Sequence, residues 1–158
     1  FKKETEQAAF LFLKCDNNAD NVYIIEDIYF CKSEDLAYEH KYYLELTDEA
    51  KQKIIKKAWD TKTIIAEVHS HHSTLGRAEF SPSDIAGFQE FVPHVWWRLK
   101  SGPYFALVFN KTSFDSLAWI NNPLNPTGIV GLKVSAKRII KSTGLTFARL
   151  KEGFGTHE

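Results

Sequence analysis

Three residues in the middle of the chain are of types that bind metal ions. His69 and His71 end a run rich in β-branched residues that begins at Thr63, and the run is typical of a strand. Because successive side chains of a strand point to opposite faces, the two imidazoles should lie on the same face. Asp84 follows after a short loop, near the start of a helix predicted from Ser81. Two histidines and one carboxylate, with a fourth position left for water, are the ligands of a catalytic zinc site, so we expect one Zn²⁺ per chain.

The helix start itself has a simpler interpretation that must be weighed beside the metal site. Ser81-Pro82-Ser83-Asp84 places Ser at the cap, Pro at the first helical position and an acid at the third. The two roles are compatible, because a capped helix N-terminus can also present a carboxylate to an ion. His94, beside Pro93 and two tryptophans, is expected to be a packed or hydrogen-bonded structural residue.

The pattern resembles the signature of the JAMM (JAB1/MPN/Mov34) zinc metalloproteases. That signature is His-x-His, a loop and Ser-x-x-Asp, and here it is matched by His69-Ser70-His71 and Ser81-x-x-Asp84. The family also carries a glutamate three residues before a small residue in an early apolar strand. Glu6 stands three residues before Ala9, where the family usually has Gly.

The resemblance covers residues 4 to 120, and the stretch from Phe80 to Trp119 is similar to the prokaryotic branch of the family. Some proteins of that branch belong to bacterial operons that attach and remove ubiquitin-like proteins. The resemblance implies an MPN/JAB-like α/β domain of mixed α+β character, with a central mixed β-sheet flanked by helices in a cytidine-deaminase-like architecture.

By the same resemblance, zinc held by His69, His71 and Asp84 would activate water for amide hydrolysis. Glu6 would be the general base, and Ser81 would donate a hydrogen bond to the oxyanion. The substrate would be a ubiquitin-like protein or its conjugate, cut at the isopeptide or peptide bond after its C-terminus.

Two choices of residue remain open at this point. His72 occupies a position where the family commonly has Pro, and the loop that follows is slightly longer than usual, so His71 or His72 could be the second ligand. Strand alternation favours His71. Glu67 shares the ligand face, so it is either an alternative base or a partner that orients His69. The resemblance favours Glu6 as the base.

Two other functions are compatible with the sequence. MPN relatives that lack the ligands serve as non-catalytic scaffolds in larger complexes, and a JAMM-like hydrolase could act on small peptides or cell-wall fragments. The intact ligand set argues against the scaffold.

The elements that must position these residues follow from apolar patterning. The predicted order is roughly β-β-α-β-α-β-β-β, a mixed α/β or α+β domain. Strands are expected at 8–13, 21–31, 63–71, 103–110, 114–120 and 129–135, and helices from Thr47 and from Ser81 to Pro93. The polar segment 32–45 is expected to be irregular, with a short strand at 42–44, and to contact an extended substrate tail.

Length and charge limit the remaining choices. The 158 residues fit one domain, expected over 1–150, with a frayed tail at 151–158. Twenty basic residues balance twenty acidic ones, so neither nucleic acid nor an anionic membrane is an expected partner. No apolar run approaches the ~20 residues that span a bilayer. Cys15 and Cys31 are expected to be buried and reduced, which suits a cytoplasmic protein.

Overall fold

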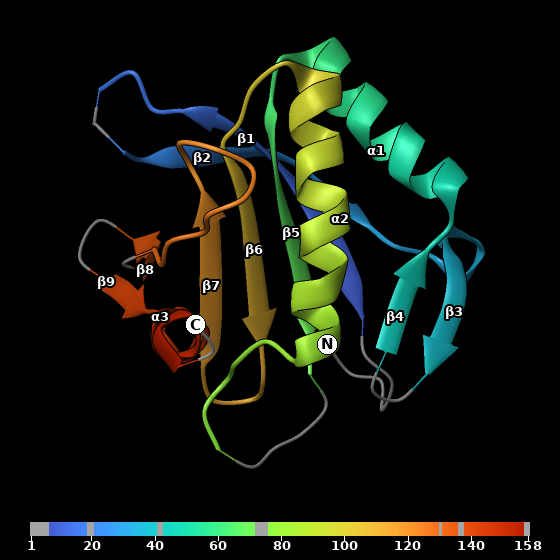
Figure 1. The fold of residues 1–158 in the computed structure, drawn as a ribbon. Coiled ribbons are helices and arrows are strands. Elements are labelled where there is room, and N and C mark those ends of the chain that lie inside the picture. Colours follow the sequence, from blue (N-terminus) through green and yellow to red (C-terminus); the bar gives the residue numbers. More distant parts are fainter. Residues whose placement is uncertain are drawn as a thin grey trace.

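A five-stranded mixed sheet forms the centre of the protein (Figure 1). The structure is a computed structural model that describes residues 7–18, 21–40, 43–71, 76–129, 131–135 and 138–156. The strand order is β2-β1-β5-β6-β7, and only β5 and β6 pair in parallel. The strands are β1 (Ala8–Cys15), β2 (Tyr23–Phe30), β5 (Ile64–Ser70), β6 (Tyr104–Phe109) and β7 (Phe114–Trp119).

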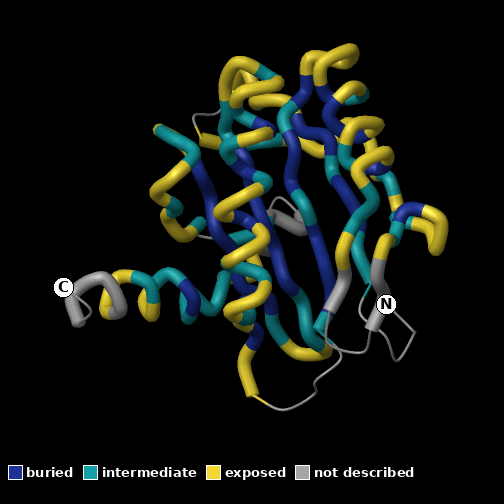
Figure 2. Tube along the Cα trace, turned by 45° about the vertical axis from the view of Figure 1, so that its right-hand side comes forward, coloured by how far each residue is buried: buried dark blue, intermediate teal, exposed yellow. Residues whose placement is uncertain are grey.

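Alternation along these strands gives the sheet two apolar faces. One face carries Phe10, Ile65 and Tyr104 and belongs to the larger core cluster, whereas the other carries Ala66 and Phe105. The hairpin predicted for the first two strands is present, since β1 and β2 pair antiparallel. Dark-blue stretches in Figure 2 mark the buried parts of the sheet, which are longest in β6 and β7.

Three helices contribute to the core on the first face of the sheet. They are α1 (Asp48–Thr61), α2 (Pro82–Leu99) and α3 (Leu145–Thr156), and each adds apolar side chains to the larger core cluster, among them Ile54, Val92 and Phe147. In Figure 1, α2 runs along the sheet and α1 lies beside it. The prediction of a mixed α/β fold, a sheet flanked by helices, is therefore confirmed. Among the described residues, no helix is both long enough and apolar enough to cross a membrane.

Helix α1 begins where the sequence predicted. The Thr47 side chain accepts a hydrogen bond from the Ala50 backbone N–H (3.1 Å), which satisfies one donor of the first turn. The chain leaves the helix through Lys62, which has a left-handed backbone (φ 56°).

The sequence predicted that helix α2 ends near Pro93, but the helix continues to Leu99. A proline inside a helix removes one backbone hydrogen bond and costs about 3 kcal/mol. Val92 and Val95, on either side of it, are 0% and 2% exposed. Burying each side chain contributes about 1.5–3 kcal/mol, so packing outweighs the local penalty.

The segment 32–45 is more regular than predicted. It contains a 3₁₀ turn, η1 (Ser33–Asp35), followed by a hairpin of β3 (Leu36–His40) and β4 (Tyr43–Leu46). The buried Asp35 carboxylate anchors the start of the hairpin, since it accepts hydrogen bonds from the Tyr29 hydroxyl (2.7 Å) and the Lys32 N–H (2.8 Å). Lys53 Nζ lies 3.3 Å from the same carboxylate. A sequence pattern does not reveal such a long-range anchor.

The C-terminal part also differs from the prediction. The strand expected at 129–135 is shorter, β8 (Gly131–Ser135), and pairs with the unpredicted β9 (Arg138–Lys141). Helix α3 extends to Thr156, into the tail that the sequence predicted to be frayed from residue 151. Phe147 and Leu150 pack on the core, which explains why this segment is helical.

The two cysteines are free, and the prediction that both are buried is wrong for Cys15, which is exposed. Cys31 is partly buried. Burial, together with the negative charges of Asp35 and Glu67, raises the pKa of the Cys31 thiol to about 12. This thiol therefore stays protonated at neutral pH.

The fully buried Asp115 fixes the start of α3 and gives a first test of the fold. Its carboxylate accepts hydrogen bonds from the Gly144 N–H (3.1 Å) and the Thr146 N–H (3.0 Å). Asp115→Ala should lower the free energy of unfolding by about 2–4 kcal/mol, because it leaves buried donors without acceptors. Asp60→Ala removes only an exposed i,i+4 ion pair with Lys56, so it should cost less than about 0.5 kcal/mol. Urea unfolding of both variants measures the difference, and equal midpoints would contradict this role.

Candidate metal centre

The candidate metal ligands come from the end of one strand and the start of one helix. His69 is the second-last residue of β5, and His71 directly follows that strand. Asp84 lies in the first turn of α2. The His71 N–H donates to the Phe109 carbonyl of β6 (2.7 Å), so the chain beyond β5 still follows the sheet. His69 and His71 therefore stay on the same face, as strand alternation predicted.

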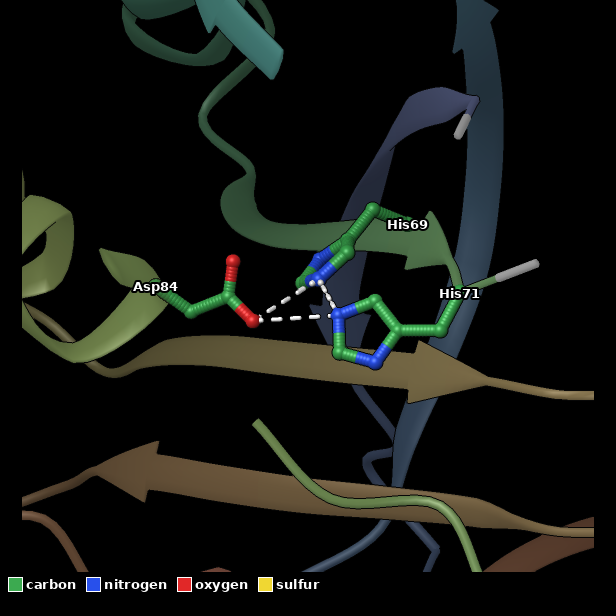
Figure 3. A group of neighbouring side chains, drawn as sticks. All are labelled: His69, His71 and Asp84. Carbon is green, nitrogen blue, oxygen red and sulfur yellow. Dashed lines mark hydrogen bonds and ion pairs between the residues drawn. The ribbon is translucent and has the colours of Figure 1, made fainter. Parts of the chain in front are cut away.

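The three side chains converge on one point (Figure 3). His69 Nε2 lies 3.2 Å from His71 Nε2, and Asp84 Oδ2 lies 3.3 Å from the first nitrogen and 3.2 Å from the second. The three donor atoms thus form a nearly equilateral triangle. His69 is buried, and the other two residues are partly buried.

This triangle has the dimensions of a zinc site. Zinc binds nitrogen and oxygen at about 2.0–2.1 Å, and in a tetrahedron that places neighbouring ligand atoms about 3.3 Å apart. The observed distances of 3.2 to 3.3 Å agree with that value. His69, His71 and Asp84 therefore form a candidate metal site, with the donor types of a three-ligand zinc centre.

A capping box at the start of α2 orients Asp84. The Ser81 N–H donates to Asp84 Oδ2 (2.8 Å), and the Asp84 N–H donates to Ser81 Oγ (3.1 Å). The helix-cap interpretation is confirmed and leaves the metal-site interpretation open, because the oxygen used in the cap also faces the histidines. Burial would raise the pKa of Asp84, but hydrogen bonds from His69 and His71 outweigh it and hold that pKa well below its usual range. The carboxylate is ionised, which is the form that binds a metal.

Glu67 lies two residues before His69 on the same face of β5 and is partly buried. The Tyr104 hydroxyl, from the neighbouring strand, donates a hydrogen bond to Glu67 Oε1 (2.7 Å). Burial raises the pKa of Glu67 above its ordinary value, although the bond from Tyr104 and the charge of His69 act against it. The fixed contact to Tyr104 holds one oxygen of this carboxylate in the protein interior.

Two residues of the sequence prediction, Glu6 and His72, lie outside the described residues. Gln7, the first described residue of the chain, is hydrogen-bonded to the end of β5. The Gln7 N–H donates to Ser70 Oγ (3.0 Å), and the Ser70 N–H donates to the Gln7 carbonyl (2.9 Å). Ser70 stands between the two candidate histidine ligands in the sequence, so Gln7 pairs with the strand that carries them.

Two hollows flank the centre. A cavity of about 440 Å³ has His69 and Asp84 in its wall, and a smaller one of about 270 Å³ has His71 and Ser81 in its wall. Two arginines, Arg77 and Arg149, also line the smaller hollow. His94 lines the larger cavity and is more exposed than predicted, although its ring lies 6.2 Å from that of Trp97.

In comparisons with known proteins, the chain matches no protein-family model, and no curated protein matches its sequence significantly.

The triangle predicts the metal content of the purified protein. We expect close to one zinc per chain, and either His69→Ala or Asp84→Ala should abolish tight binding because two ligands do not complete the site. His71→Ala should have the same effect, whereas His72→Ala should retain the metal. Metal analysis by mass spectrometry after dialysis measures all four variants.

His94→Ala is the matched control, since it removes an imidazole that lines the neighbouring cavity but does not belong to the triangle. Zinc retained in both His69→Ala and Asp84→Ala would rule out this ligand set. Loss of zinc in His72→Ala, but not in His71→Ala, would assign the second ligand to His72.

Proposed function

We propose that this protein is a zinc-dependent hydrolase of the JAMM type, which cleaves the amide bond after the C-terminus of a ubiquitin-like protein. The observation that carries the hydrolase proposal is the triangle of His69, His71 and Asp84, with its 3.2 to 3.3 Å edges. Three protein ligands leave a fourth position for water, as in catalytic zinc sites. The choice of substrate rests on the sequence resemblance described above.

The side chains present fit the chemistry of amide hydrolysis. A zinc ion held by these residues would act as a Lewis acid and lower the pKa of a bound water to about 7. A general base is then needed, and Glu6 is our choice. Its chain neighbour Gln7 makes two hydrogen bonds to Ser70, one through its N–H and one through its carbonyl, and Ser70 lies between the two histidines in the sequence. Glu6 would take the proton from the attacking water and pass it to the leaving amine.

Ser81 supplies the second element of the reaction. Its Oγ accepts the Asp84 N–H, so the oxygen is fixed while its own hydroxyl proton remains available to donate. Ser81 and His71 both line the smaller hollow, which supports a role for that hydroxyl beside the candidate metal site. A hydrogen bond donated to the developing oxyanion is typically worth about 10²–10³-fold in rate.

Glu67 differs from Glu6 in what its contacts allow. One of its oxygens accepts the Tyr104 hydroxyl, and Tyr104 is fully buried. A carboxylate held this way suits a positioning or binding role better than one that must transfer a proton in both directions. We therefore assign the base to Glu6 and not to Glu67.

Substitution of the two glutamates separates these roles. Glu6→Gln should keep the zinc and the fold but slow turnover by about 10²–10⁴-fold, because the base is lost. Glu67→Gln should change the zinc-saturated rate much less. Metal content and single-turnover rates under saturating zinc measure both effects. A normal rate in Glu6→Gln, beside an inactive but zinc-loaded Glu67→Gln, would reverse the assignment.

The substrate class is tested with a ubiquitin-like protein fused through its C-terminus to a reporter domain. The zinc-loaded protein should release the reporter with a cut at the junction, a chelator should stop the reaction and added zinc should restore it. His69→Ala is the inactive control. Cleavage of short peptides without cleavage of any fusion would indicate a peptide hydrolase instead. A metal-free protein that still binds its partner, with no turnover before or after zinc addition, would indicate a scaffold.

A further inference from the structure

The larger cavity beside the metal centre is built from elements that lie far apart in the sequence. Its lining comes from strands β1, β4 and β5 and from helices α1 and α2, and it reaches His69 and Asp84 directly. A substrate group that enters it is therefore next to the candidate ligands. With a volume of about 440 Å³, it is large enough to hold a long side chain.

The deeper walls of the cavity are apolar. Phe10 and Phe88 are buried, while Leu46 and Phe91 are partly buried and line the same space. Aromatic and aliphatic walls of this kind hold the methylene stem of a long side chain. The faces of aromatic rings also attract cations.

Gly87 keeps one side of this cavity open. The stripe of α2 that faces the cavity contains Asp84, Gly87 and Phe91, at helical spacing. A glycine inside a helix costs about 1 kcal/mol relative to alanine. No atom lies within 4 Å of the place where a Cβ of Gly87 would stand, so close packing against a neighbour does not explain the residue. Gly87 is exposed and lines the cavity, so a larger side chain at this position would extend into open space at the edge of the cavity.

The charges around the cavity are predominantly negative. Among the residues that the structure describes, and apart from the candidate ligand Asp84, four carboxylates and one ammonium, that of Lys51, line the cavity. The carboxylates belong to Glu45, Asp48, Glu67 and Glu90. Glu67 lies on the sheet side, beside His69, whereas the other three are exposed. Lys51 places its ammonium 5.8 Å from the centre of the Phe91 ring, so one cation already occupies this environment.

We infer that this cavity binds a basic side chain of the substrate, a lysine or an arginine close to the cleaved bond. The apolar walls fit the stem of such a side chain, Glu67 and the exposed carboxylates pair with its charged end, and Gly87 leaves room for it. An acidic side chain would meet four carboxylates and is excluded. The reference to a cleaved bond rests on the proposed function, whereas binding of the cation does not.

The test measures binding and not cleavage, so its outcome is independent of the hydrolase assay. The probes are Nα-acetyl-lysine amide and Nα-acetyl-norleucine amide, which have similar stems but differ in the terminal charge. Titration of the zinc-loaded protein, followed by NMR, should show about 10–100-fold tighter binding of the lysine probe, as expected for a charge-assisted hydrogen bond. Shifted resonances should include those of Phe91 and His94.

Three variants locate the binding. Gly87→Leu fills the space that the glycine leaves and should abolish binding of the lysine probe without loss of the fold, because leucine favours a helix. Glu67→Gln should remove most of the preference for lysine over norleucine. Glu152→Gln, an exposed acid on α3 that does not line the cavity, should change nothing. Equal affinity for the two probes, or a lysine preference that survives Gly87→Leu or Glu67→Gln, would overturn the inference.

Discussion

The structure of the site depends on one carboxylate oxygen, Oδ2 of Asp84. It accepts the backbone N–H of Ser81 and faces the Nε2 atoms of His69 and His71 at 3.2 to 3.3 Å. That position requires the helix to begin at Ser81, and it requires the parallel pairing that places β5 and β6 under α2. The apolar packing of α2 on the sheet thus fixes the position of the Asp84 carboxylate at the edge of the core.

The same triangle would couple metal binding to the stability of the fold. Two imidazoles 3.2 Å apart repel each other when both are protonated, and the nearby carboxylate offsets only part of that charge. A metal ion bound in place of these protons would accept the lone pairs of both imidazoles and of the Asp84 carboxylate. Any ligand that binds the folded state alone stabilises it by mass action, so a metal ion bound by these three residues would also stabilise the fold.

The site was more predictable from sequence than its surroundings. His69 and His71 share a face because of strand periodicity, and Asp84 follows a cap motif, so local rules suffice for both. The cavity is different, because its walls come from β4, α1 and α2, which meet only in the folded chain. The continuation of α2 past Pro93 and the hairpin anchored by Asp35 were missed for the same reason: buried tertiary contacts outweigh the local signals.

The pair of hydrogen bonds between Gln7 and Ser70 has a consequence for the order in which the site forms during folding. These residues are 63 positions apart, whereas His71 and Asp84 are separated by only 13. Closing the shorter loop costs less chain entropy, so the ligand half of the site is able to form before the N-terminal strand joins the sheet. If the base is Glu6, a nascent chain would acquire its metal before it acquires its activity, and docking of β1 would complete the enzyme.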